Sequence, residues 1–193
     1  MRRKRIQTIG AILTLALLVT GCANSGTEQR EDGEYQTIEL TMAVNGTDNQ
    51  IDARVGDYFA QLVSERSGGN VTVAVFPNDQ LANGNASRGI EMIASGSIDL
   101  AAYATCTLAV IDEKLPVATI PWIFDDYAQA REVIDTTGGE YYAQRLAMKG
   151  MTYLGSFHNG FRQITNSKHE VTDPSDMENL KIRVPGSVVY MGF

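Results

Sequence analysis

The sequence is poor in the residues that most catalytic and metal centres require. It has two cysteines and two histidines in 193 residues, and neither His158 nor His169 stands at a metal-ligand spacing. It contains no Gly-x-Ser-x-Gly elbow, no phosphate-binding loop and no dinucleotide fingerprint. The adjacent carboxylates Asp125 and Asp126 are explained more simply as a helix N-cap than as an acid/base pair. The sequence therefore favours a protein that is not an enzyme and that uses no metal and no cofactor.

Positive charge is also scarce. The chain has 16 lysines and arginines against 23 aspartates and glutamates, which gives a formal net charge of -7. A nucleic-acid surface needs clustered basic groups that displace counterions, so a nucleic-acid partner is excluded. An anionic small ligand stays compatible with this charge, because a single buried arginine decides the electrostatics of a pocket.

The N-terminus carries an apolar run that is too short to span a bilayer. This run, Ile6 to Thr20, has roughly 15 residues, whereas a spanning helix needs about 20. It follows the basic stretch Arg2 to Arg5, and this order is typical of an export signal over residues 1–21. Removal of that signal takes away four positive charges and no negative one, so the formal charge changes from -7 to -11.

Cys22 follows the apolar run directly, in the stretch "VTGCANSG". The stretch resembles the bacterial lipobox, which implies cleavage before Cys22 and lipid attachment to this residue as an anchor to the membrane. The alternative is an ordinary secretory cleavage site with an incidental cysteine. Residues 22–36 are polar and lack periodicity, so we expect a flexible tether. Once Cys22 carries lipid, Cys106 has no disulfide partner and is expected to be a small buried hydrophobe.

Hydrophobic periodicity predicts an α/β fold with a parallel sheet covered by helices. Strand-like and helix-like segments alternate from Thr37 to about residue 105, which is the pattern of that architecture. The predicted strands cover 37–45, 70–76 and 97–105. One predicted helix begins at Ile51 with an apolar stripe and ends at Ser67–Gly69, and a second covers 87–95. Farther on, we expect an extended segment at 115–126, a helix that Gly138 and Gly139 end, a helix at 140–149 and strands at 151–157 and 180–184.

Two arginines stand in otherwise apolar, strand-like surroundings: Arg162 in "NGFRQIT" and Arg183 in "LKIRVPG". A buried arginine needs a partner, because an isolated buried charge is expensive. Its guanidinium matches a carboxylate, which belongs either to the protein or to a ligand. From residue types alone, a surface or internal salt bridge is the simpler interpretation, and a ligand site is the alternative.

Several segments, taken in order, resemble one known family. They are "ERSGGNVTVAVFPNDQLA", "GIEMIASGSIDLA", "LPVATIPWIFDDYAQAREV", "NGFRQITNSK" and "DMENLKIRVPGS". The set is similar to the DctP-type solute-binding subunit of tripartite ATP-independent periplasmic (TRAP) transporters, over about Ile38 to Phe193. The resemblance implies a periplasmic-binding-protein-like fold of two α/β lobes that closes on an organic acid. Lobe I would cover 37–158 and the crossover and start of lobe II would cover 159–193.

The resemblance also implies where the solute binds. Arg183 falls on the arginine that is the family's main carboxylate partner, and Arg162 falls on a second anion contact. Asn45 occupies a position that often faces the ligand from the other lobe. Tyr103 and Ser187 lie in segments that line the pocket. These assignments imply capture of an organic acid between Arg183 and Arg162 on one side and groups such as Asn45 on the other.

The sequence departs from the family pattern in ways that concern the ligand. The segment "AYATCTLAV" lacks the charged residues of members that bind sialate, which argues against a sugar acid and favours a mono- or dicarboxylate. His158 stands where an acidic residue is common, and it is interpreted either as a polar loop residue or as a group that tunes the pocket with pH. Family members also continue beyond this point, so we expect a fragment in which lobe II is only begun, and residues 22–193 alone to be poorly soluble or to bind solute weakly.

The function that the resemblance implies is extracytoplasmic capture of a solute and its delivery to the membrane subunits of a TRAP permease. The first alternative is a ligand-sensing lipoprotein that serves a signalling receptor through the same pocket. The second is a secreted enzyme whose catalytic residues lie in a C-terminal part that is missing here.

Overall fold

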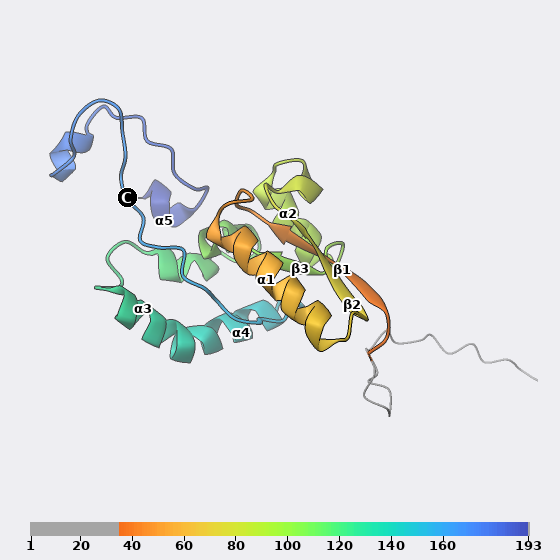
Figure 1. The fold of residues 1–193 in the computed structure, drawn as a ribbon. Helices are drawn as coiled ribbons and strands as arrows, with labels where there is room; N and C mark the ends of the chain where they lie inside the picture. The colour runs from red at the N-terminus through yellow and green to blue at the C-terminus, as the bar shows by residue number, and fades with distance from the viewer. Residues whose placement is uncertain (1–34, 193) are drawn as a thin grey trace, which may run out of the picture.

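A parallel sheet forms the centre of the computed structural model, which describes residues 35–192 (Figure 1). Strand β1 (Ile38–Val44) lies between β2 (Val71–Phe76) and β3 (Leu100–Ala102). Ile38 lies opposite Val71, and Met42 lies opposite both Val75 and Leu100. The predicted parallel α/β arrangement is confirmed. The third strand is shorter than expected, because the chain turns after Ala102 into the 3-10 helix η2 (Thr105–Val110).

Helix α1 (Ile51–Arg66) lies across one face of this sheet (Figure 1). Gly56 lets the helix approach closely, because a Cβ at this position would lie 3.2 Å from Cγ1 of Val75 and 3.5 Å from Sδ of Met42. The predicted apolar stripe closes the core only in part, because Phe59 packs against it whereas Ile51 and Tyr58 are exposed. The buried core residues are Met42, Val44, Ala53 and Ala102, with Phe59, Val73, Val75 and Leu100 packed against them.

Two short helical segments follow β2 and lead toward β3. They are the 3-10 helix η1 (Gln80–Ala82) and helix α2 (Ala86–Ala94). Asn85 caps α2, since its Oδ1 accepts a hydrogen bond of 3.1 Å from the backbone N–H of Arg88. The predicted helix at 87–95 is therefore confirmed, with its start one residue earlier.

The two predicted helices are present, but the break between them does not fall at Gly138 and Gly139 as predicted. Helix α3 (Tyr127–Val133) leads into a π-helical segment, η4 (Ile134–Gly138), and then into α4 (Gly139–Ala147), and a kink inside η4 separates the two helices. Both glycines keep right-handed helical angles, and the irregularity falls on Thr136. The Thr136 hydroxyl donates 2.7 Å to the carbonyl of Glu132, a back-bond that bends helices without ending them.

Of the other local predictions for this region, one is confirmed and one is wrong. Asp126 caps α3 as expected, because its carboxylate accepts a 2.8 Å bond from the N–H of Gln129. The segment expected to be extended over 115–126 instead contains the 3-10 helix η3 (Leu115–Thr119). Pro116 falls in the first turn of this helix, where its missing N–H costs nothing. Proline therefore starts a helical turn here and does not mark extended chain.

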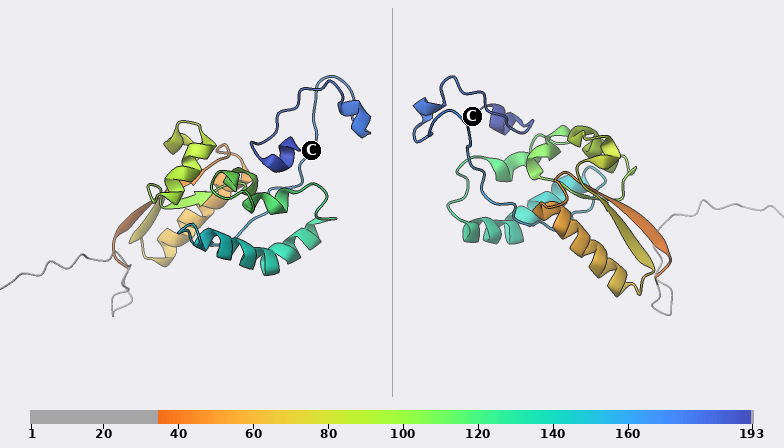
Figure 2. Two further views of the ribbon diagram at one scale, coloured as in Figure 1. Left: turned by 180° about the vertical axis from the view of Figure 1, so that it is seen from behind. Right: turned by 45° about the horizontal axis from the view of Figure 1, so that its top comes forward.

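The strands predicted at 151–157 and 180–184 are wrong for the part of the chain that the structure describes. Residues 151–173 have no regular secondary structure, and the chain runs away from the sheet in both views of Figure 2. A strand needs a neighbour that accepts its ladder of hydrogen bonds, and here none lies alongside. Only the 3-10 helix η5 (Pro174–Met177) and the short helix α5 (Val188–Met191) interrupt the coil.

An ion pair between Asp112 and Arg145 ties α4 to the segment that precedes η3. The backbone N–H of Lys114, which donates 3.0 Å to Asp112, lowers the pKa of this carboxyl, and Arg145 lowers it further. A lowered pKa in the folded state stabilises the fold above the unfolded value of about 3.9, and the contribution disappears as pH falls through the folded value.

We therefore expect Asp112→Asn to lower the melting temperature at pH 7 and to lose this effect below about pH 4. Melting curves of the wild type and the variant between pH 3 and pH 7 measure the difference. Asp57→Asn, on the exposed face of α1, is the matched control. A difference in melting temperature that stays constant over this pH range would contradict the assignment.

Candidate functional site

The carboxyl edge of the sheet gathers two of the residues that the sequence singled out. Asn45 follows β1 directly, and Tyr103 follows β3 directly. In open parallel sheets, ligands bind in the crevice outside the carboxyl ends of the strands. Both side chains are partly exposed there, so both are accessible to a small molecule. The predicted positions of Asn45 and Tyr103 on one edge are thereby consistent with a shared site.

Asp79 joins these two side chains, and sequence reasoning missed it. Its carboxylate accepts 2.7 Å from Nδ2 of Asn45 and 2.6 Å from the hydroxyl of Tyr103. The residue is buried, with 6% of its surface exposed. Its backbone is left-handed, with φ of 51°, and its N–H donates 3.1 Å to the carbonyl of Val44. The signal that could have found it is an acidic residue three positions after the end of β2.

Tyr103 is fixed from its other side by α2. A Cβ on Gly89 would lie 2.3 Å from the Tyr103 hydroxyl oxygen, so only glycine fits here. Burial, followed by the hydrogen bond to Asp79, raises the pKa of Tyr103 above its usual range. The hydroxyl therefore keeps its proton and donates a hydrogen bond to Asp79.

Arg162 lies against η2 and α5. Its Nε donates 3.2 Å to the hydroxyl of Tyr190, and its guanidinium carbon lies 5.1 Å from the centre of that ring. Burial raises the pKa of the Cys106 thiol, and the neighbouring guanidinium of Arg162 partly offsets that rise. Cys106 is free and buried, as predicted. Arg162 thus connects the segment after β3 with the end of the described chain.

Ser187 and Arg183 flank the entry to α5 and have different environments. Ser187 is 1% exposed, and its hydroxyl caps α5 by accepting 3.3 Å from the N–H of Val189. Arg183 is exposed in the coil before α5. Within residues 35–192 the only salt bridge joins Arg145 to Asp112, so neither Arg183 nor Arg162 has an internal carboxylate partner there. Within this part of the chain, neither arginine forms the salt bridge that the residue types alone had favoured.

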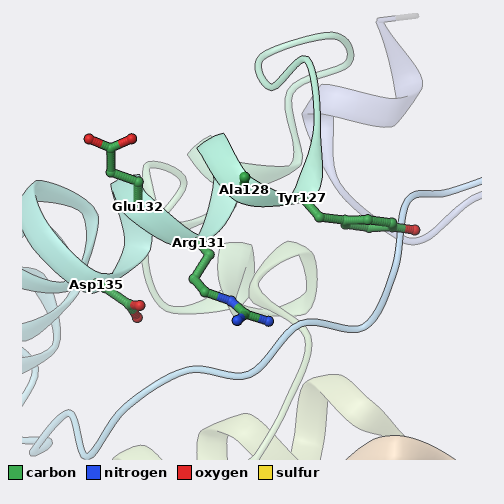
Figure 3. Close-up of a pocket in the computed structure, with 5 residues that line it drawn as sticks. All are labelled: Tyr127, Ala128, Arg131, Glu132 and Asp135. Carbon is green, nitrogen blue, oxygen red and sulfur yellow. The ribbon is translucent and has the colours of Figure 1, made fainter.

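A surface pocket lies elsewhere, on α3, and none of the predicted site residues lines it (Figure 3). Its lining residues are Tyr127, Ala128, Arg131, Glu132 and Asp135.

The rings of Tyr127, His158 and Phe161 pack together beside this pocket. Tyr127 stacks on Phe161 with ring centres 4.6 Å apart, and His158 meets the Tyr127 ring edge-on at the same distance. Nδ1 of His158 accepts 2.8 Å from the N–H of Gly160. His158 thus holds the coil onto α3, which fits its interpretation as a polar loop residue.

Two kinds of feature were sought over residues 35–192 and not found. No helix in this range is both long and apolar enough to cross a membrane. No three or more side chains of His, Cys, Asp or Glu gather into a group that could hold a metal ion. The signal peptide predicted at 1–21 and the lipid attachment predicted at Cys22 lie outside the described residues.

Known proteins resemble this chain over most of its length. The profile of bacterial extracellular solute-binding protein, family 7 (DctP), matches residues 42–192. The 2,3-diketo-L-gulonate-binding periplasmic protein YiaO of Escherichia coli K12 is 30% identical over 175 residues, which cover 91% of this chain and 51% of YiaO. The chain thus spans about half the length of this relative.

Two solved structures have the same fold. One is a TRAP periplasmic solute binding protein from Ralstonia eutropha with bound (S)-2-acetolactate, at 27% identity and a TM-score of 0.76. The other is the sugar acid binding protein DctPAm from Advenella mimigardefordensis in complex with galactonate, at 29% identity and a TM-score of 0.75. In each case the match covers 81% of this chain and 50% of the solved chain. The similarity therefore extends across the sheet, the helices and the coil that carries Arg162.

Proposed function

The chain belongs to bacterial extracellular solute-binding protein family 7, the solute-binding proteins of TRAP transporters, and on this premise we propose that it captures an organic acid outside the cytoplasm for delivery to a membrane permease. The names of the similar proteins support the choice of solute, since acetolactate, galactonate and diketogulonate are all organic acids. The chain would act by binding alone, and the permease would supply the energy of transport.

The observation that carries this proposal is the pair of arginines without an internal carboxylate. Arg162 donates a hydrogen bond to Tyr190 and lies beside Cys106. Cys106 in turn follows Tyr103 by three positions in the sequence. Within 35–192 the guanidinium of Arg162 bonds to the hydroxyl of Tyr190 and to the thiol of Cys106, and no carboxylate there offsets its charge. A guanidinium in this state favours a bound carboxylate, because charged hydrogen bonds are about twice as strong as neutral ones.

The proposed mechanism assigns a role to each of these groups. The carboxylate of the solute pairs with Arg183 and Arg162, and the rest of the molecule reaches Asn45 and Tyr103 at the carboxyl edge of the sheet. Ser187 supports the arginine side by capping α5. Residues 37–158 form lobe I, and 159–193 form the crossover and the start of lobe II. A solute that contacts both sides stabilises the closed state of the lobes, and this state docks on the permease.

The location of the protein follows from its first residues. Residues 1–21 direct export, and Cys22 carries lipid that anchors the mature chain to the cell membrane through the tether at 22–36. Acyl chains hold a protein at a membrane by burying methylene groups, at about 0.8 kcal/mol each. This arrangement keeps the binding lobes close to the permease.

A screen of the full-length gene product against organic acids tests the function. An acid present at about 100 times its Kd is expected to stabilise the fold by about 2.7 kcal/mol, which thermal-shift measurement detects as a higher melting temperature. Arg162→Ala is expected to reduce this shift, and Arg88→Ala, at an exposed position on α2, is expected to leave it unchanged. A complete set of small organic acids that produces no shift would overturn the proposed function.

A further inference from the structure

Asp79 determines which hydrogen-bonding groups the carboxyl edge can offer to a solute. A carboxylate only accepts hydrogen bonds, so the atom of Asn45 at 2.7 Å must be the amide nitrogen and the Tyr103 hydroxyl must donate its single hydrogen. Asn45 then keeps one N–H and its Oδ1 for a partner, and no other residue within 35–192 bonds to them. Tyr103 keeps only oxygen lone pairs. This end of the site therefore presents one donor and mainly acceptors.

The charge at the same edge points the same way. The loop after β1, residues 45–50, carries Asp48, the segment between β2 and α2, residues 77–85, carries Asp79, and Asp52 lies in the first turn of α1. Neither segment contains a lysine or an arginine, and the arginines that follow them, Arg54 and Arg88, are exposed on α1 and α2. Asp52 is buried and accepts a hydrogen bond of 2.7 Å from the N–H of Gly46, so its carboxylate serves the fold. A second carboxylate on a solute would thus meet the buried charge of Asp79 without a cation in either segment to offset it.

From this geometry we infer that Asp79 is a positioning residue that determines which solute group binds beside Asn45 and Tyr103. At this end of the site it favours a solute hydroxyl over a solute carboxylate. The solute is then a polyhydroxy monocarboxylic acid, with its one carboxylate on the arginines and its hydroxyl groups at the sheet edge. A hydroxyl both donates and accepts, so it satisfies Oδ1 and the remaining N–H of Asn45 together. This inference rests on the proposed function, and it returns to a sugar acid, the class that the segment "AYATCTLAV" made less expected than a simple mono- or dicarboxylate.

Two pairs of acids isolate the terminal group. D-Galactonate and galactarate differ only in a terminal CH2OH against a carboxylate, and D-erythronate and meso-tartrate differ in the same way with a shorter carbon chain. Calorimetry on the full-length gene product is expected to give at least about tenfold tighter binding of the monoacid in the pair whose length fits, because like charges in close contact are costly.

Asp79→Asn tests the role of the residue itself. Asparagine has nearly the same shape and tolerates the left-handed backbone at this position. The asparagine side chain has only one oxygen, so it cannot accept hydrogen bonds from Asn45 and Tyr103 through two oxygens. The substitution also removes the negative charge. We expect the preference for the monoacid over the diacid to fall about tenfold or more, with the diacid gaining. Asp57→Asn on α1 removes the same charge elsewhere and is expected to leave the preference unchanged.

The outcomes separate the inference from the function. Equal or tighter binding of the diacid by the wild type would overturn the inference and leave the function standing. A variant in which both affinities fall equally would show a merely structural Asp79, and it too would overturn the inference. Should Asp79→Asn not fold, the preference of the wild type within each pair still decides. If the wild type binds none of the four acids, nor any other acid of the screen, both the inference and the proposed function fail.

Discussion

Replacing Arg183 with alanine in the full-length gene product is expected to weaken binding of its organic acid at least about 100-fold and to leave the melting temperature of the unliganded protein unchanged. A charged hydrogen bond contributes about 1.5–3 kcal/mol, and a guanidinium that grips a carboxylate forms two of them. The fold does not depend on this side chain, because Arg183 is exposed and has no ion pair within residues 35–192. Calorimetric titration measures the loss of affinity.

Two variants make the test of Arg183 specific. Lys181→Ala removes a positive charge from the same exposed coil and is expected to change the affinity little. Arg183→Lys keeps the charge but loses the planar pair of donors, so we expect an intermediate loss. Unchanged affinity in Arg183→Ala would show that the resemblance misplaces the carboxylate partner, and Arg162 would then be the remaining candidate.

Replacing Tyr142 with alanine is expected to destabilise the fold by about 3–5 kcal/mol, the range observed when a large buried aromatic ring is removed. Tyr142 is 2% exposed, and its hydroxyl donates 2.8 Å to the carbonyl of Leu115. Its ring also stacks against Tyr153, with centres 6.2 Å apart. One side chain therefore fastens α4 to η3 and to the coil that follows α4.

The phenylalanine variant separates packing from hydrogen bonding at this position. Tyr142→Phe keeps the ring but leaves the carbonyl of Leu115 without its donor, so we expect a loss of about 1–3 kcal/mol. Scanning calorimetry of the wild type and both variants gives the order. Equal melting temperatures for the wild type and Tyr142→Ala would mean that α4 contributes little to the cooperative unit.

The elements that the sequence predicted well are those whose signals are local. The stripe of α1 and the apolar runs of β1 and β2 repeat with a clear period over many residues, and their partners follow closely in the chain. The failures come where tertiary contacts decide. Gly138 and Gly139 are compatible with helix or with a stop, and both keep helical angles while the break between α3 and α4 falls at Thr136. Residues 151–157 have strand composition but no neighbouring strand within the described chain.

The site was predictable to the same degree. Only the resemblance implied Asn45 and Tyr103 as site residues, and Tyr103 fell inside the strand predicted at 97–105; the structure brings both to one edge because β3 ends at Ala102 and parallel strands end together. Asp79 could not be chosen in advance from among the chain's many carboxylates, since its role depends on two partners that lie 34 and 24 positions away in the sequence. Residue types singled out Arg162 and Arg183 but favoured a salt bridge, and only the family resemblance assigned them to a ligand.

The close contact between Gly89 and Tyr103 restricts the order in which this sequence can evolve. Because a Cβ at position 89 would come within 2.3 Å of the tyrosine oxygen, any larger residue there displaces the ring that Asp79 holds. Tyr103 can lose its hydroxyl without help, whereas Gly89 can change only after that loss. A lineage that altered its solute preference through this edge would therefore pass through position 103 first, and a return would require glycine at 89 again.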